Sequence, residues 1–168
     1  MSSLTFSLFQ DGNQISTALN ELQLSYMKSL DDQSMRGWLD CFAEQASYIC
    51  TTRENVEQNL PIALMMDDTR ARIEDRGRAV EKVWAGTFED YRTRHFIQNL
   101  KYVEVSEGRW AAESNFMVTC TTTRGDIRLL AAGVYMDEIV LVGASAKFSS
   151  RKAVLDASTT PRYLVYPI

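Results

Sequence analysis

The sequence predicts an α+β fold in which one curved, mostly antiparallel sheet wraps around N-terminal helices. Two observations carry this prediction. Apolar residues recur every three or four positions in three stretches before residue 85, and they alternate with polar residues in long stretches after residue 93. Residues 110–123 alternate best; one face is formed by Trp110, Ala112, Ser114, Phe116, Val118 and Cys120. Helices followed by antiparallel strands are typical of an α+β layer arrangement.

The first helix is expected over residues 14–30, where one apolar stripe runs through Ile15, Leu19, Leu22, Tyr26 and Leu30. Asp11 or Asn13 is available as its N-cap, and the first ten residues are expected to form an arm lying on a surface. The pair Asp31–Asp32 then interrupts the pattern and is expected to cap a second helix. The stripe of that helix is Met35, Trp38, Leu39 and Phe42.

The middle of the chain contains shorter elements. Residues 46–51 are β-branched and aromatic, which favours a strand, and residues 53–61 are polar, which favours a loop. Residues 62–66 form a second short apolar run. The pair Asp67–Asp68 is expected to cap a third helix that ends at about Trp84.

Four strands follow. Residues 94–105 carry apolar side chains on both faces, which predicts a strand that is covered on both sides or bent by a bulge. After the strand described above, residues 124–126 form a turn. Residues 127–142 form the next strand, with Gly133 as a bulge or bend, and residues 144–155 form the last one.

The residue inventory excludes several metal sites. His95 is the only histidine, whereas a Rieske centre needs two histidines and a facial-triad iron site also needs two. Neither site can therefore be assembled within one copy of this chain. Cys41, Cys50 and Cys120 lie far apart without a CxxC pair, so we expect buried free thiols.

His95 is the one candidate for catalysis. It could act as a general acid or base in the mouth of the curved sheet, helped by Asp40 or Glu44. The favoured interpretation is instead a histidine that is hydrogen-bonded at a sheet face or subunit contact, because one unpartnered histidine is weak evidence for an active site. The aspartate pairs at 31–32 and 67–68 could suggest metal binding, but each stands where a helix should begin, so capping is favoured.

The composition is that of an ordinary globular domain. Hydrophobic residues make up 45% and charged residues 24% of a chain of 168 residues, for which one domain is the usual expectation. The net charge of −4 and the scattered basic residues argue against nucleic acid as a partner. No signal peptide and no apolar run of membrane-spanning length is visible. We therefore expect a single cytoplasmic domain over residues 1–168, bound neither to nucleic acid nor to a membrane.

The closing segment RYLVYPI carries no charge after Arg162. Its apolar side chains need an apolar surface, in this chain or in another. We expect both this tail and the outer face of the sheet to be buried against other subunits, so that deletion of residues 162–168 weakens assembly more than folding.

Taken together, the segments LDDQSMRGWLDCFAEQASY, DDTRARIEDRGRAVEKVWA, YRTRHFIQNLKYVEV and AAGVYMDEIVLVGASAKFSSRKAVLD, with the closing LVYPI, resemble the small (beta) subunit of aromatic-ring-hydroxylating dioxygenases. The resemblance covers nearly the whole chain after about Gln14. It implies a cone-shaped fold, nuclear transport factor 2-like or SnoaL-like, that is shared with ketosteroid isomerase and scytalone dehydratase.

The resemblance also implies a function. In this family three small and three large subunits form a heterohexamer, and the large subunit carries the Rieske 2Fe–2S cluster, the mononuclear iron and the substrate pocket. Electrons derived from NAD(P)H arrive through a reductase or ferredoxin. This chain is then a non-catalytic structural subunit without catalytic, cofactor-binding or metal residues, and the tail looks most like enzymes acting on salicylate, anthranilate and similar benzoates. Two alternatives stay open: a free-standing cone-fold dehydratase or isomerase using His95, and a small-ligand binding module with an empty apolar interior.

Overall fold

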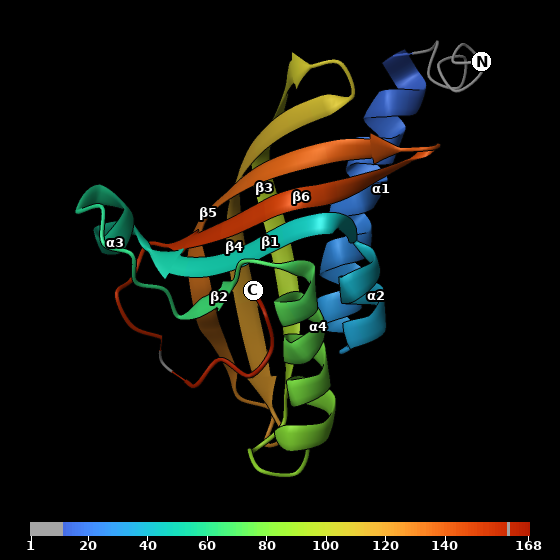
Figure 1. The fold of residues 1–168 in the computed structure, drawn as a ribbon. Helices are drawn as coiled ribbons and strands as arrows, with labels where there is room; N and C mark the ends of the chain where they lie inside the picture. The colour runs from blue at the N-terminus through green and yellow to red at the C-terminus, as the bar shows by residue number, and fades with distance from the viewer. Residues whose placement is uncertain (1–11, 161) are drawn as a thin grey trace.

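The computed structural model describes residues 12–160 and 162–168, and it has the predicted α+β architecture (Figure 1). The helices are α1 (Gly12–Asp31), α2 (Met35–Asp40), α3 (Arg53–Glu57) and α4 (Arg70–Arg78), the last continued by a π-helical turn, η2 (Ala79–Val83). The strands are β1 (Phe42–Thr52), β2 (Met65–Asp67), β3 (Tyr91–Ser106), β4 (Arg109–Thr122), β5 (Ile127–Val142) and β6 (Ser145–Leu155). The arm predicted for the first ten residues and the possible cap Asp11 lie outside the described residues.

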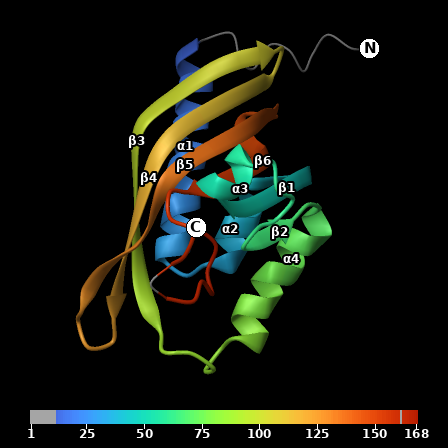
Figure 2. The same ribbon diagram turned by 90° about the vertical axis from the view of Figure 1, so that its left-hand side faces the viewer.

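The six strands form one curved sheet in the order β2-β1-β6-β5-β4-β3. Strands β1 and β6 are parallel, and the other neighbouring pairs are antiparallel. Figures 1 and 2 show α1 running along one face of this sheet; α2 packs beside α1, and α4 packs against α2 and β1. The mostly antiparallel sheet curved around helices is therefore confirmed.

The core lies between α1 and the inner face of the sheet. The predicted stripe of α1 is buried from Leu19 to Leu30, with Ile15 at the rim. On β4 the predicted inward residues from Ala112 to Cys120 are buried, while Met117 on the other face is exposed. The two periods read from the sequence thus identify the faces that meet in the core.

The second helix is shorter than predicted, because Phe42 already belongs to β1. The capping residue is Ser34, whose Oγ accepts a hydrogen bond from the Gly37 amide at 3.2 Å. The prediction that Asp31–Asp32 cap this helix is wrong. Asp31 is the last residue of α1, and Asp32 forms an ion pair with Lys28 at 2.6 Å.

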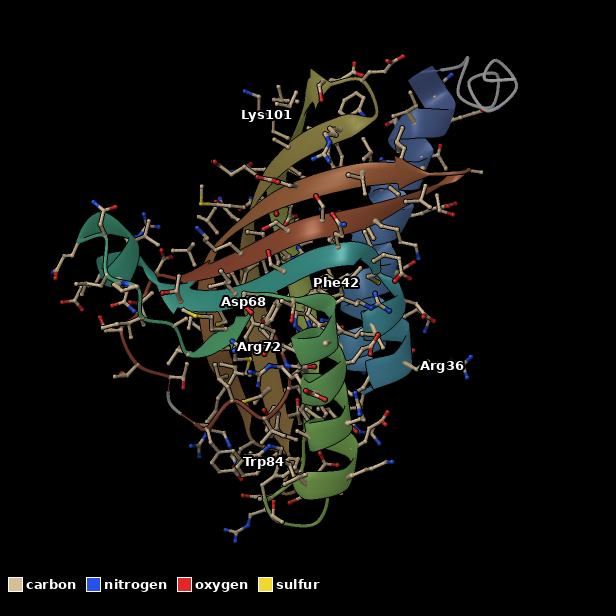
Figure 3. All side chains as sticks on the ribbon, viewed as in Figure 1. Arg36, Phe42, Asp68, Arg72, Trp84 and Lys101 are labelled. Carbon is tan, nitrogen blue, oxygen red and sulfur yellow. The ribbon has the colours of Figure 1, made fainter. Side chains whose placement is uncertain are left out.

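The third helix begins later than predicted. Its N-cap is Thr69, whose hydroxyl accepts from the Arg72 amide, so the capping prediction for Asp67–Asp68 is also wrong. Asp67 lies in β2 and pairs with Arg76, while Asp68 lies 3.4 Å from Arg72 at the start of α4 (Figure 3). In both helices an uncharged hydroxyl next to the first turn makes the cap.

Two further expectations need correction, and one is confirmed. Part of the predicted loop at 53–61 is the short helix α3. The bulge expected in β3 is present between Gln98 and Lys101, where Asn99 has a φ of 54°. Gly133, however, is not a bulge, because it pairs in register with Phe116 and Leu155; the alternative of a bend at this residue stays a prediction. A Cβ at this position would lie 1.9 Å from the main-chain oxygen of Val154, so glycine permits β6 to approach β5 closely.

The tail is buried in its own chain. Val165 and Ile168 belong to the same core cluster as Tyr26 and Trp38, and the C-terminal label lies in the middle of the molecule in both ribbon views (Figures 1 and 2). The expectation that other subunits bury the tail is wrong for these residues. The cone formed by the sheet and helices supplies the apolar surface that they require.

Candidate functional site

His95 pairs with Asp31, which approaches it from the end of α1. The Nδ1 atom of His95 lies 2.7 Å from Oδ1 of Asp31, and the main-chain N–H of His95 donates to Oδ2 at 3.2 Å. The hydroxyl of Thr93 donates to the same carboxylate at 3.1 Å. The alternation of β3 points both Thr93 and His95 inward, where α1 ends. One carboxylate thus connects the last turn of α1 to three groups on β3.

The environment keeps Asp31 charged. Partial burial raises its pKa, but the hydrogen bonds and the proximity of His95, with the bond from Thr93, outweigh this effect and leave the pKa below its ordinary value. The carboxylate therefore favours a proton on Nδ1 of His95. The opposite nitrogen, Nε2, is buried and has no hydrogen-bond partner among the described residues. The His95 side chain is only 1% exposed.

The sequence predicted Asp40 or Glu44 as the acid beside His95, but the structure places Asp31 there. Asp40 lines a hollow of about 210 Å³ between α1, α2 and the start of β6, and His95 is not among its lining residues. Glu44 is exposed on β1. Asp31 was missed because its place at a helix boundary favoured a cap. It precedes His95 by 64 residues, so only the tertiary fold brings the two together.

A second polar cluster, absent from the sequence predictions, fills the interior of the cone. Arg151 on β6 and Asp137 on β5 are cross-strand partners with fully buried side chains, and Nε of Arg151 lies 3.4 Å from Oδ1 of Asp137. Gln23 on α1 accepts from Nη2 of Arg151 at 3.0 Å and donates to Oδ2 of Asp137 at 3.1 Å. The three side chains join both layers of the fold.

Aromatic rings enclose the guanidinium of Arg151. Its Cζ atom lies 3.9 Å from the ring centroid of Tyr26, 3.8 Å from that of Tyr135 and 4.4 Å from that of Phe148. Burial lowers the pKa of Arg151, but attraction to Asp137 and to nearby tyrosines outweighs burial and raises it overall. The guanidinium therefore keeps its charge inside the cone, stabilised by cation–π contacts and one carboxylate.

The outer face of the sheet carries another feature. Phe96 on β3 and Met117 on β4 are cross-strand neighbours, 52% and 42% exposed. A separate hollow of about 520 Å³, which neither residue lines, is formed by residues of β3, β4, β5 and β6; its lining includes Lys101, Val103, Glu113, Met136, Glu138 and Lys152. Lys101 lies on the curled end of β3 (Figure 3). The solvated face of an antiparallel sheet is ordinarily polar, so exposed apolar residues here indicate a contact surface.

The described residues contain neither a candidate metal cluster nor a helix of membrane-spanning character. Within residues 12–160 and 162–168 no group of three or more histidine, cysteine or acidic side chains is placed to hold a metal ion. None of the helices in that part of the chain combines the length and the hydropathy needed to cross a bilayer.

Comparison with known proteins now identifies the family. The model of the family "Ring hydroxylating beta subunit" matches residues 27–162. The small subunit of anthranilate 1,2-dioxygenase from Burkholderia cepacia is 26% identical over 147 residues, which are 88% of this chain and 90% of the relative. A beta subunit of the terminal oxygenase component of terephthalate 1,2-dioxygenase from a Comamonas species is 25% identical, covering 89% of this chain and 99% of the relative.

The fold agrees with this assignment. The crystal structure of a beta subunit assigned to an aromatic-ring-hydroxylating dioxygenase of Novosphingobium aromaticivorans superposes with a TM-score of 0.78 at 28% identity. The match covers 88% of this chain and 93% of that one. The resemblance seen in the sequence is confirmed: this chain belongs to the ring-hydroxylating beta-subunit family and is a small subunit of the ring-hydroxylating dioxygenase type.

Proposed function

We propose that this chain is the non-catalytic structural subunit of a multicomponent aromatic-ring-hydroxylating oxygenase of the EC 1.14 type. The observation that carries this proposal is the occupied interior of the cone. Arg151, its aromatic neighbours and Ile168 fill the space between α1 and the sheet. With one histidine in the whole sequence, the chain also lacks the ligands for the iron chemistry of such an enzyme.

The iron centres are then expected in a large subunit that this chain helps to assemble. We propose that the large subunit carries a Rieske 2Fe–2S cluster and a mononuclear iron, and that a reductase or ferredoxin delivers electrons derived from NAD(P)H. The proposed assembly contains three copies of each subunit and resides in the cytoplasm. The substrate is proposed to be an aromatic acid of the benzoate or salicylate type, because the relatives are named for anthranilate and terephthalate.

A second candidate function rests on the pair of His95 and Asp31. An aspartate that orients a histidine is the arrangement expected of a general base, as in a free-standing dehydratase or isomerase. Family membership does not favour this alternative, and Nε2 of His95 is buried. We propose instead that the pair fixes the end of α1 against β3. The small-ligand module is disfavoured as well, because it requires an empty apolar interior.

The test is reconstitution with a large oxygenase subunit, which we expect to be encoded next to this chain. We expect iron to purify with the large subunit or with the complex, and not in stoichiometric amount with this chain alone. A His95→Gln variant is expected to lower the melting temperature of the chain while kcat per assembled, iron-loaded complex stays within about twofold of wild type. Loss of a general acid or base typically costs about 10²- to 10⁴-fold. A loss of that size in a fully assembled complex would overturn the proposal in favour of catalysis by His95.

A further inference from the structure

The end of the C-terminal tail (Arg162–Ile168) is held inside the cone, although the tail belongs to no strand or helix. Ile168 is 1% and Val165 6% exposed. The segment that joins β6 to the tail lies on the surface, with residues 156–159 exposed. The chain therefore leaves the core at Leu155, crosses the surface and returns to the core at the tail.

Tyrosine hydroxyls from three elements hold the main chain of the tail. The hydroxyl of Tyr48 on β1 accepts from the amide of Ile168 at 2.8 Å and lies 3.2 Å from the main-chain oxygen of Ile168, to which it donates. Tyr26 on α1 donates to the same oxygen at 2.6 Å, and Tyr91 on β3 accepts from the amide of Val165 at 3.3 Å. The tail is thus recognised as a peptide is, through its main-chain polar groups together with buried apolar side chains.

The rings that carry these hydroxyls have neighbours of their own. Tyr26 makes edge contacts with Phe42 and Phe148, at centroid distances of 6.2 and 5.6 Å. Tyr48 makes edge contacts with Trp38 and Phe42, at 5.5 and 6.2 Å. None of these contacts involves the tail, so the rings that carry both hydroxyls are positioned without it. Burial also raises the pKa values of both tyrosines, which keeps the hydroxyls protonated as donors.

A second set of aromatic residues covers the tail nearer the surface. Phe88, in the loop before β3, contacts the rings of Tyr163 and Tyr166, both at 6.0 Å. Tyr166 also contacts Tyr91 at 5.7 Å. The tail therefore has an inner anchor at Ile168 and an outer aromatic anchor. The tail thus occupies a pocket with defined contacts at both anchors.

We propose that the interior end of the cone is a preformed peptide-binding site, occupied in cis by the tail, and that it binds an apolar segment of the type Val-Tyr-Pro-Ile without a covalent connection. The ligand class follows from the contacts: two apolar side chains at the positions of Val165 and Ile168, and exposed main-chain groups for the three tyrosine hydroxyls. A site with this property can also accept the tail of a second copy of the chain, as in segment exchange.

The experiment uses the full chain with a protease site placed at residues 157–159, which are exposed and tolerate such a change. After cleavage, the released segment is expected to co-elute with the body of the protein in gel filtration. A fluorescent synthetic peptide, RYLVYPI, is expected to exchange into the cleaved protein and to be competed away by unlabelled peptide, but not by a scrambled sequence. Immediate separation of the segment, with no binding of labelled peptide at about 100 μM, would overturn the proposal, since the tail would then be held only by its covalent connection.

Variants test the assigned contacts. Tyr48→Phe removes the partner of both the amide and the oxygen of Ile168, so peptide affinity is expected to fall about tenfold or more. Tyr26→Phe removes one bond, and about a fivefold loss is expected. The control is Tyr102→Phe, which removes a hydroxyl bonded to the main-chain oxygen of Leu19 at 3.0 Å, away from the tail. This variant should bind the peptide with the affinity of the wild-type protein.

If a tyrosine variant does not fold after cleavage, the same contacts are tested by changing the peptide instead of the protein. Cleaved protein without a substitution should bind a peptide carrying Ile168→Ala at least tenfold more weakly than the wild-type peptide, because the changed peptide loses a buried side chain. Binding of this peptide, or of wild-type peptide by Tyr48→Phe protein, with wild-type affinity would show that the contacts described here do not form the site.

Discussion

The carboxylate of Asp31 lies 2.7 Å from Nδ1 of His95 and so connects the last residue of α1 to the middle of β3. A negative charge at the C-terminal end of a helix is unfavourable by itself, because the helix dipole places negative charge there. The ring of His95, its main-chain N–H and the hydroxyl of Thr93 compensate for that position. These contacts support the proposal that the pair fixes the end of α1 against β3.

Replacing this carboxylate by an amide should destabilise the chain. Asp31→Asn keeps the shape but removes charge-assisted bonds, each with a typical contribution of about 1.5–3 kcal/mol. We expect a loss of about 2 kcal/mol in the free energy of unfolding, measured by urea denaturation at pH 7. The control is Asp32→Asn: the Asp32 side chain is exposed and, among the described residues, pairs with Lys28 alone, so a change below about 0.5 kcal/mol is expected. Equal losses in the two variants would contradict the role given to Asp31.

The same pair predicts a dependence on pH. The folded pKa of Asp31 lies below its ordinary value of 3.8, so the unfolded state binds the proton more tightly. The stabilisation by Asp31 is therefore complete above the unfolded pKa, and it is lost as the pH falls through the lower, folded pKa. The difference in unfolding free energy between wild type and Asp31→Asn should shrink as the pH falls from 5 to below about 4. A constant difference down to pH 2.5 would show that the carboxylate is not the titrating group.

Much of the fold could be predicted because it depends on local periodicity. The stripe of α1 and the alternation of β4 place Leu22 and Val118 in the core from the sequence alone. The capping errors have a local cause: aspartate, serine and threonine all cap helices, and the sequence offers them side by side at residues 31–34 and 67–69. The chemistry of the candidate site was less accessible. Pairs such as Arg151 with Asp137, or Ile168 with Tyr48, join distant residues, and no local signal records these contacts.

Gly133 and Gly77 should respond in opposite ways to alanine. At Gly133 a Cβ would lie 1.9 Å from the main-chain oxygen of Val154, and the β5–β6 backbones must separate to admit it. We expect a loss of more than about 2 kcal/mol or failure to fold. At Gly77 in α4 the nearest atom is the Cβ of Met35 at 3.7 Å, an ordinary contact, so alanine should stabilise by up to about 1 kcal/mol. Thermal melts of the two variants check this, and a well-folded Gly133→Ala protein would contradict the close approach of the strands.

Removing one member of the buried pair of Arg151 and Asp137 should lower the free energy of unfolding more than replacing both members by apolar residues. Arg151→Met leaves the Asp137 carboxylate without its counter-ion in the interior, and a loss of about 3–5 kcal/mol is expected. The double variant with Asp137→Leu removes both charges and should recover part of that loss, because the surrounding rings can pack against apolar side chains while the buried amide of Gln23 loses both partners. Urea denaturation of the single and double variants gives the coupling free energy. Additive losses would mean that the two side chains do not depend on each other.

The exposed apolar residues on the outer sheet face should matter for assembly and not for folding. Phe96 and Met117 face away from the core, so Met117→Lys is expected to change the unfolding free energy of the isolated chain by less than about 0.5 kcal/mol. A lysine buried in a contact with the large subunit would instead be desolvated, and truncation or charge at the centre of such a contact typically costs about 2 kcal/mol or more, near 30-fold in affinity.

The matched control is Leu24→Lys on α1, which places the same charge on an exposed apolar position away from the sheet. Titration of each variant against the large subunit separates the outcomes: a selective loss for Met117→Lys supports the outer face as the contact, and wild-type affinity would exclude it.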